Sequence, residues 1–182
     1  MLPLIPPNNR IADFYAGSEP DHQGRYLGEI LEWSDDELER VHDYIQWLFP
    51  LQERSGFNAN APVLDRQTIQ EFRSRPDLHR NVRVSYHRML AFYGLEIVES
   101  CPPTVRRAPS FAERSKNWLT ASNHNHLRIT RILKSVRTLG LEIEATALFD
   151  CLADIHNEEA AKDLPGISEE TFRFWQSAVR ER

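Results

Sequence analysis

The sequence predicts an all-α fold, a single compact domain of about seven to nine helices. A chain of 182 residues with 41% hydrophobic content can bury a core without disulfide or metal support. Only 7 glycines and few alternating runs of valine, isoleucine and threonine argue against a turn-rich β fold. We therefore expect residues 1–9 to form an irregular lead-in and residues 10–182 to form one helical domain.

In the first half of the chain, the clearest helix start is at Ser34, which forms an S-x-x-E capping box with Glu37. Pro50 should stop that helix after Phe49. Pro76 suits the first turn of a longer helix, which Gly94 ends. The expected helices span residues 11–15, 26–33, 34–49, 65–74 and 76–93, with a loop at 51–64.

In the second half, residues 95–109 carry three prolines and predict a long loop. Gly140 suits the end of a helix with an aliphatic stripe, and Ser168 should cap the last helix after a Pro-Gly turn. The expected helices span residues 110–118, 125–139 and 144–160, followed by the helix that Ser168 begins.

The predictions of compartment and cofactor rest on sequence motifs that the chain lacks. Cys101 and Cys151 lie far apart in no metal-ligand spacing, which favours a reduced, cytoplasmic protein over a disulfide. Prolines interrupt the first ten residues where a signal peptide needs an apolar run, and no stretch approaches the roughly 20 apolar residues of a membrane helix. We expect a soluble protein without a cofactor; the oligomeric state is not predicted.

The stretch HDYIQWLFP, residues 42–50, places side chains that need specific surroundings on two opposite faces of its expected helix. Leu38, Val41, Ile45 and Leu48 fall on one arc, whereas Asp43 and Trp47 lie near the opposite side. Either this helix runs through the centre of the domain, or Trp47 belongs to a ligand surface. In the central-helix reading, His42 and Gln46 are polar groups at the edge of the core.

Residues 104–138 are basic, with eight basic side chains and one acidic, in a chain of net charge −5. Four of these cations, Arg128, Arg131, Lys134 and Arg137, lie on the helix expected from residue 125. Such a helix can bind phosphates or a peptide carboxylate. It can equally pair with the acidic segment 13–43, and both alternatives stay open.

Catalytic and metal sites are poorly supported. His124 and His126 have an H-x-H spacing, but no third ligand is evident, and an asparagine beside them should cap the helix. The chain lacks the G-x-S-x-G, G-x-x-x-x-G-K-[ST], H-E-x-x-H and G-x-G-x-x-G motifs. We therefore expect no catalytic residues, no metal site and no enzyme activity.

Two blocks, HDYIQWLFPL at 42–51 and LRITRILKSVR at 127–137, together with FYG at 92–94 and LPG at 164–166, resemble the conserved N-terminal region of the opioid growth factor receptor family. That resemblance implies a receptor-like module that binds a short peptide or protein segment similar to methionine-enkephalin. Vertebrate members of the family associate with the nuclear envelope. The long tail expected for that location does not occur in this sequence, so a cytoplasmic location remains the expectation.

For peptide binding, we expect Trp47 and Tyr44 as apolar anchors, Asp43 for an amino terminus, and Arg128 or Arg131 for a carboxylate. The alternative is a nucleic-acid or phosphate binder that uses residues 104–138 and whose affinity falls steeply with salt. The acidic net charge disfavours this alternative. The complete set of candidate ligand-binding residues is His42, Asp43, Gln46, Trp47, His124, Asn125, Arg128 and Arg131.

Overall fold

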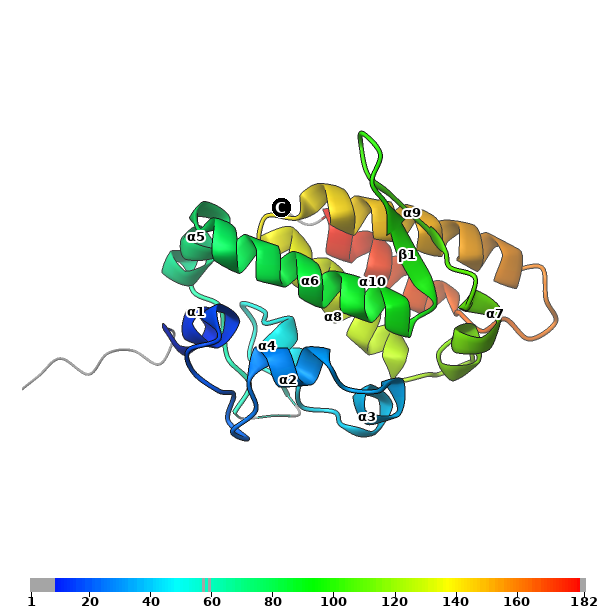
Figure 1. The fold of residues 1–182 in the computed structure, drawn as a ribbon. Coiled ribbons are helices and arrows are strands. Elements are labelled where there is room, and N and C mark those ends of the chain that lie inside the picture. The colour runs from blue at the N-terminus through cyan, green and yellow to red at the C-terminus, as the bar shows by residue number, and fades with distance from the viewer. Residues whose placement is uncertain (1–8, 57, 59, 181–182) are drawn as a thin grey trace, which may run out of the picture. The chain divides into compact units, whose positions relative to one another are not determined.

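The computed structural model describes residues 9–56, 58 and 60–180, and most of them are helical (Figure 1). Ten α-helices and one two-stranded antiparallel sheet form in these residues. The predominantly helical prediction is confirmed, but a purely all-α fold is wrong. The chain divides into two compact units, residues 1–85 and residues 86–182, and the boundary between them falls within one helix. The expected single-domain organisation stays a prediction, and the lead-in residues 1–8 lie outside the described residues.

The elements follow the predicted order closely. In the first part of the chain they are α1 (Asn9–Ala16), α2 (Leu27–Leu31), α3 (Asp35–Arg40), α4 (Ile45–Leu48), α5 (Arg66–Ser74) and α6 (Pro76–Phe92). They continue with β1 (Leu95–Val98), β2 (Thr104–Arg107), α7 (Phe111–Arg114), the short 3-10 helix η1 (Ser115–Asn117), α8 (Asn125–Thr138), α9 (Glu142–Glu159) and α10 (Glu169–Arg180). None of the described helices has the length and apolar character needed to cross a membrane.

The helix expected over residues 34–49 is broken into α3 and α4, which corrects the prediction. Its capping box is confirmed, since Ser34 Oγ accepts a hydrogen bond from Glu37 N at 3.3 Å and Glu37 Oε2 accepts one from Ser34 N at 2.9 Å. The helix ends at Arg40 because Val41 is extended, with φ −89° and ψ 134°. A continuous helix with one buried face would have left Trp47 outside, whereas all four residues of α4 are buried.

Aromatic rings form the core of residues 9–85. Phe14 of α1 meets Trp47 edge-on with ring centroids 5.3 Å apart, and Tyr15 meets Phe72 of α5 at 5.1 Å. The Tyr15 hydroxyl donates a hydrogen bond to the carbonyl of Leu48. These contacts fix α1, α4 and α5 against one another and place Trp47 at the edge of this core.

The long loop expected over residues 95–109 is instead a β-hairpin. Leu95 pairs with Arg107 and Val98 with Thr104, and the chain between the strands contains the cis bond Cys101–Pro102. The strands are only four residues each, too short for a clear alternating pattern. Gly94 allows the preceding turn because its φ is +74° and an added Cβ would lie 2.8 Å from Phe111 Cα.

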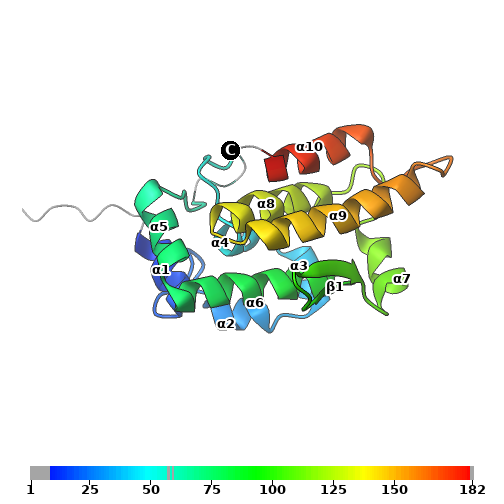
Figure 2. The same cartoon turned by 90° about the horizontal axis from the view of Figure 1, so that it is seen from above.

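Three helices, α8, α9 and α10, lie side by side in residues 86–182, and β2 packs against α9 (Figure 2). Two buried tryptophans in this unit donate hydrogen bonds from their indole N–H groups to carbonyls that are distant in the sequence. Trp118 Nε1 donates to the carbonyl of Tyr93 at 3.0 Å, and Trp175 Nε1 donates to the carbonyl of His126 at 3.1 Å. The predicted cap of α10 is confirmed, since Ser168 Oγ accepts a hydrogen bond from Thr171 N at 3.1 Å.

Candidate functional site

A chain of polar contacts runs from Trp47 in the unit of residues 1–85. Trp47 is only 2% exposed, and its Nε1 donates to His22 Nδ1 at 2.9 Å. On the other side of the imidazole, His22 Nε2 lies 3.2 Å from Asp43 Oδ2. The break before α4 thus brings two residues of the 42–50 block, Asp43 and Trp47, to the two ends of one histidine.

Arg25 extends this chain of contacts to a buried carboxylate. It donates from Nη1 to Asp43 Oδ1 at 2.9 Å and from Nε to Asp21 Oδ2 at 2.7 Å. Burial lowers the pKa of Arg25, but its hydrogen bonds to Asp21 and Asp43 outweigh this and raise the pKa above the ordinary value. Both carboxylate oxygens of Asp43, the residue predicted to hold a peptide amine, are therefore engaged within the fold.

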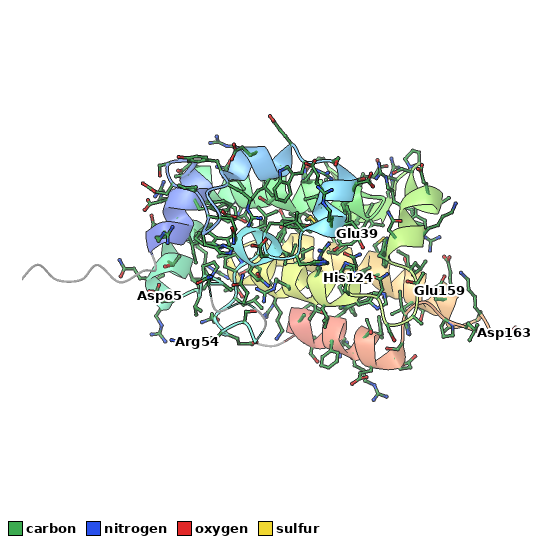
Figure 3. All side chains as sticks on the ribbon, turned by 90° about the horizontal axis from the view of Figure 1, so that it is seen from below. Glu39, Arg54, Asp65, His124, Glu159 and Asp163 are labelled. Carbon is green, nitrogen blue, oxygen red and sulfur yellow. The ribbon has the colours of Figure 1, made fainter. Side chains whose placement is uncertain are left out.

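A pocket of about 610 Å³ opens beside Trp47. The Arg10 guanidinium lies 5.8 Å from the centre of the Trp47 ring. Arg54 and Asp65, both labelled in Figure 3, also line the pocket. Behind Trp47, Gln46 Oε1 accepts a hydrogen bond from Asn58 Nδ2 at 2.9 Å. The lining comprises Arg10, Ile11, Trp47, Arg54, Ser55, Asn58, Asn60, Ala61, Pro62, Val63 and Asp65.

This pocket combines an apolar floor with cationic groups. Ala61, Pro62 and Val63 supply the accessible apolar surface, with Trp47 buried beneath it, and Arg10 and Arg54 are exposed. Asp65 already has a structural role, since it caps α5 by accepting a hydrogen bond from Thr68 N at 2.7 Å. The pocket can therefore accept a carboxylate together with an apolar side chain.

The predicted residues of the second block lie in the other unit. Asn125 and Arg128 are buried at 0% and 5% exposure, and Arg128 Nη1 donates to Asn125 Oδ1 at 3.2 Å. His124 is exposed, and Arg131 is half-buried (Figure 3 labels His124 at the start of α8). Of the first block, His42 is exposed and Gln46 is buried. The eight candidates are thus divided equally between two units, and their joint role in binding stays a prediction.

His126, the second histidine of the H-x-H pair, belongs to the core of residues 86–182. Its Nε2 lies 2.9 Å from the carbonyl of Trp118, and its ring stands edge-on to Trp175 at 5.7 Å. Burial lowers the pKa of His126 below its ordinary value of 6.5, although the Trp118 contact opposes this shift. No group of three metal-ligating side chains occurs among residues 9–56, 58 and 60–180.

This pKa shift predicts an acid-dependent loss of stability. In the unfolded chain His126 binds a proton near pH 6.5, whereas in the folded chain it does so only at lower pH. The contribution of neutral His126 to the free energy of unfolding is therefore complete above pH 6.5 and is lost as the pH falls through the lower pKa of the folded state. Urea denaturation between pH 7.5 and about pH 5 should show this slope. His126→Gln, which keeps a donor for Trp118, should flatten it; an unchanged slope in this variant would contradict the assignment.

The basic segment 104–138 is partly neutralised inside its own unit. Arg106 Nε lies 2.7 Å from Glu96 Oε1, and Arg107 Nη2 lies 2.8 Å from Glu158 Oε2. Arg128 is buried, as noted above. Glu96 and Glu158 lie outside the acidic segment 13–43, so pairing with that segment stays a prediction, and the nucleic-acid alternative gains no support from these contacts.

The two cysteines are both free, with Cys101 exposed and Cys151 buried. Burial raises the pKa of the Cys151 thiol to about 11, with Arg107 opposing and Asp154 adding to the shift. The thiol is therefore protonated at neutral pH and lacks the character of a nucleophile.

Several residues beside Trp47 were not predicted from the sequence. Arg10 flanks the pocket from a segment far from the 42–50 block, and Arg54 flanks it from the loop that follows that block. Arg25, from the loop before α2, contacts Asp43 of the block. No local spacing links these positions, so only long-range packing identifies them. The single available signal was the Asp21-His22-Gln23-Gly24 turn, which places a histidine in a constrained loop.

Comparison with known proteins gives consistent matches. A family model described as the opioid growth factor receptor (OGFr) conserved region matches residues 12–182. The human opioid growth factor receptor is 37% identical over 162 residues, which cover 87% of this chain and 23% of that protein. The mouse opioid growth factor receptor-like protein 1 is 36% identical over 167 residues, covering 90% of this chain and 34% of that protein. The chain thus spans a minor part of the length of these relatives, and no solved structure matches.

Proposed function

The chain belongs to the opioid growth factor receptor family, and we propose that it is a non-enzymatic, receptor-like module that binds a short peptide or protein segment beside Trp47. The observation that carries this proposal is the pocket of about 610 Å³, which joins apolar side chains to two arginines. Its volume lies within the range of small-ligand sites, about 300–1,000 Å³. The names of the related proteins, which are receptors, support a binding role over catalysis.

The pocket suits the carboxyl end of a peptide. Arginine presents a planar fork that can donate two hydrogen bonds to a carboxylate, and Arg10 and Arg54 both line the pocket. The last side chain of the peptide would lie on Pro62 and Val63 beside Trp47, where burial of apolar surface adds affinity. Arg10 and Arg54 take the carboxylate role first expected for Arg128 or Arg131.

The other candidates of the first block act indirectly in this proposal. Asp43 and His22 hold the Trp47 indole from one side, and Gln46 holds Asn58 of the pocket wall. These residues are positioning residues, because their polar groups are engaged with other side chains. Methionine-enkephalin is the first peptide to test, as the family resemblance implies.

Titration calorimetry tests this proposal. Methionine-enkephalin and a library of short peptides with free carboxyl ends should give a saturable heat. Arg10→Gln with Arg54→Gln should weaken binding by about tenfold or more, because each variant loses a charge-assisted hydrogen bond. Arg40→Gln with Arg173→Gln removes the same charge elsewhere on exposed surface and should leave affinity within about twofold. The absence of saturable heat at millimolar peptide would refute peptide binding.

A further inference from the structure

A second pocket, of about 430 Å³, lies at the junction of α5 and α6, and its lining is strongly basic. Arg73 comes from the last turn of α5, Arg75 from the residue that ends it, and Arg80 and Arg83 from α6. His79 adds an imidazole, and no acidic side chain lines the pocket. The complete lining is Arg73, Ser74, Arg75, Pro76, His79, Arg80 and Arg83.

Helical spacing explains why these cations meet. Arg80 and Arg83 are three residues apart on α6, and His79 and Arg83 are four apart, so each pair lies on one face. The like charges of Arg80 and Arg83 at this spacing destabilise a helix by a few tenths of a kcal/mol. A cluster of this kind gains stability when an anion lies between its members.

Two carboxylates next to the pocket pair with Arg75. Arg75 donates from Nη1 to Glu71 Oε1 at 2.7 Å and from Nη2 to Asp77 Oδ2 at 2.6 Å. Asp77 also lies in the first turn of α6, where a carboxylate compensates the helix dipole. Arg80 has no ion-pair or hydrogen-bond partner through its side chain among the described residues. Arg80 therefore adds a positive charge to the pocket that no carboxylate of the described residues pairs with.

We propose that this pocket is an anion site that binds the phosphate of a phosphomonoester. A phosphomonoester carries close to two negative charges at neutral pH and three terminal oxygens, which suit several arginine forks at once. A pocket of 430 Å³ exceeds the volume of one phosphate group and leaves room for the group that carries it.

The grouping of the arginines favours a terminal phosphate over a nucleic-acid backbone. Binding to a polymer uses cations spread along a strip, so that several successive phosphates are neutralised. Here the cations surround one pocket, within two adjoining segments of the chain. The chain as a whole carries a net charge of −5, which repels a long polyanion.

Titration with phosphoserine tests the site, with serine, sulfate and a single-stranded oligonucleotide as parallel probes. Phosphoserine should bind saturably and weaken with added salt, and serine should not bind. Arg80→Gln with Arg83→Gln should raise the dissociation constant by about tenfold or more. Arg173→Gln with Arg180→Gln is the matched control, and circular dichroism should confirm that both double variants are folded.

Titration with inorganic phosphate distinguishes a site for free phosphate from a site for a phosphomonoester. Equal affinity for inorganic phosphate and phosphoserine would indicate a free-phosphate site, whereas tighter phosphoserine binding would indicate that the carrier is also recognised. Arg10→Gln with Arg54→Gln should leave phosphoserine binding unchanged, which keeps this test independent of the pocket beside Trp47. No saturation by phosphoserine, unchanged binding in Arg80→Gln with Arg83→Gln, or tighter binding of the oligonucleotide would overturn the proposal.

Discussion

Replacing Gly166 with alanine is expected to lower the free energy of unfolding by about 2–3 kcal/mol. A Cβ at this position would lie 2.6 Å from the carbonyl oxygen of Leu119 and 2.8 Å from its carbon. Those atoms are backbone and cannot move aside as a side-chain end can. Gly166 N also donates to Glu159 Oε2 at 3.0 Å, so a shift of the turn would lengthen a buried hydrogen bond.

Gly28→Ala provides the matched control for this substitution. Gly28 lies in α2, and a Cβ added there would meet no atom within 4 Å. Alanine favours a helix over glycine by about 0.5–1 kcal/mol, so this variant should be neutral or slightly more stable. Urea denaturation followed by circular dichroism measures both variants. Equal stabilities for Gly166→Ala and the parent protein would show that the turn can relax.

Replacing Arg25 with methionine should cost about 3 kcal/mol, because it leaves the Asp21 carboxylate without its cation. Asp21 is only 2% exposed, and besides Arg25 Nε its carboxylate accepts hydrogen bonds from the backbone N–H groups of Gln23 at 2.8 Å and Arg25 at 3.0 Å. Those backbone bonds do not supply a compensating charge. The loss is measurable as a shift in the urea midpoint.

A double variant separates the lost charge from lost packing. Adding Asp21→Asn to Arg25→Met removes the uncompensated charge and should recover part of the stability. Arg40→Met, at an exposed position of α3, should change stability by less than about 1 kcal/mol. A double variant no more stable than Arg25→Met alone would mean that the Arg25 side chain stabilises mainly by packing, including its contact with the Trp33 ring at 5.5 Å.

Local signals in the sequence identified most of the helices. Ser34 and Ser168 cap the helices that follow them, and Gly94 and Gly140, with φ of +74° and +103°, come where helices end. These signals depend on side-chain to backbone contacts within one turn. Such contacts recur wherever the same residues occur, so the sequence alone is sufficient to predict them.

The two errors in the fold both arise from long-range packing. No proline or glycine marks the break in the helix at Val41. The break is stabilised by contacts that Asp43 and Trp47 make with residues some twenty positions away. The hairpin of β1 and β2 has strands too short to show alternation, and its register depends on pairing across the turn. Tertiary contacts therefore overrode the local pattern at both places.

The candidate site was predictable only in its centre. Trp47 stood out because an aromatic residue lay out of phase with the apolar stripe of its expected helix. Arg10 and Arg54 are separated from it in sequence by loops, and single charged residues in such segments are ordinarily solvated. Arg128 looked like a ligand-binding cation because burial cannot be read from charge alone, yet it is 5% exposed.

The hydrogen bond from Trp47 to His22 determines where the imidazole carries its proton. An indole N–H can only donate, so His22 Nδ1 must offer its lone pair and the ring hydrogen sits on Nε2, facing Asp43. Trp47 therefore reports on this contact: its fluorescence should change when His22→Ala removes the acceptor of its indole N–H, without any added label.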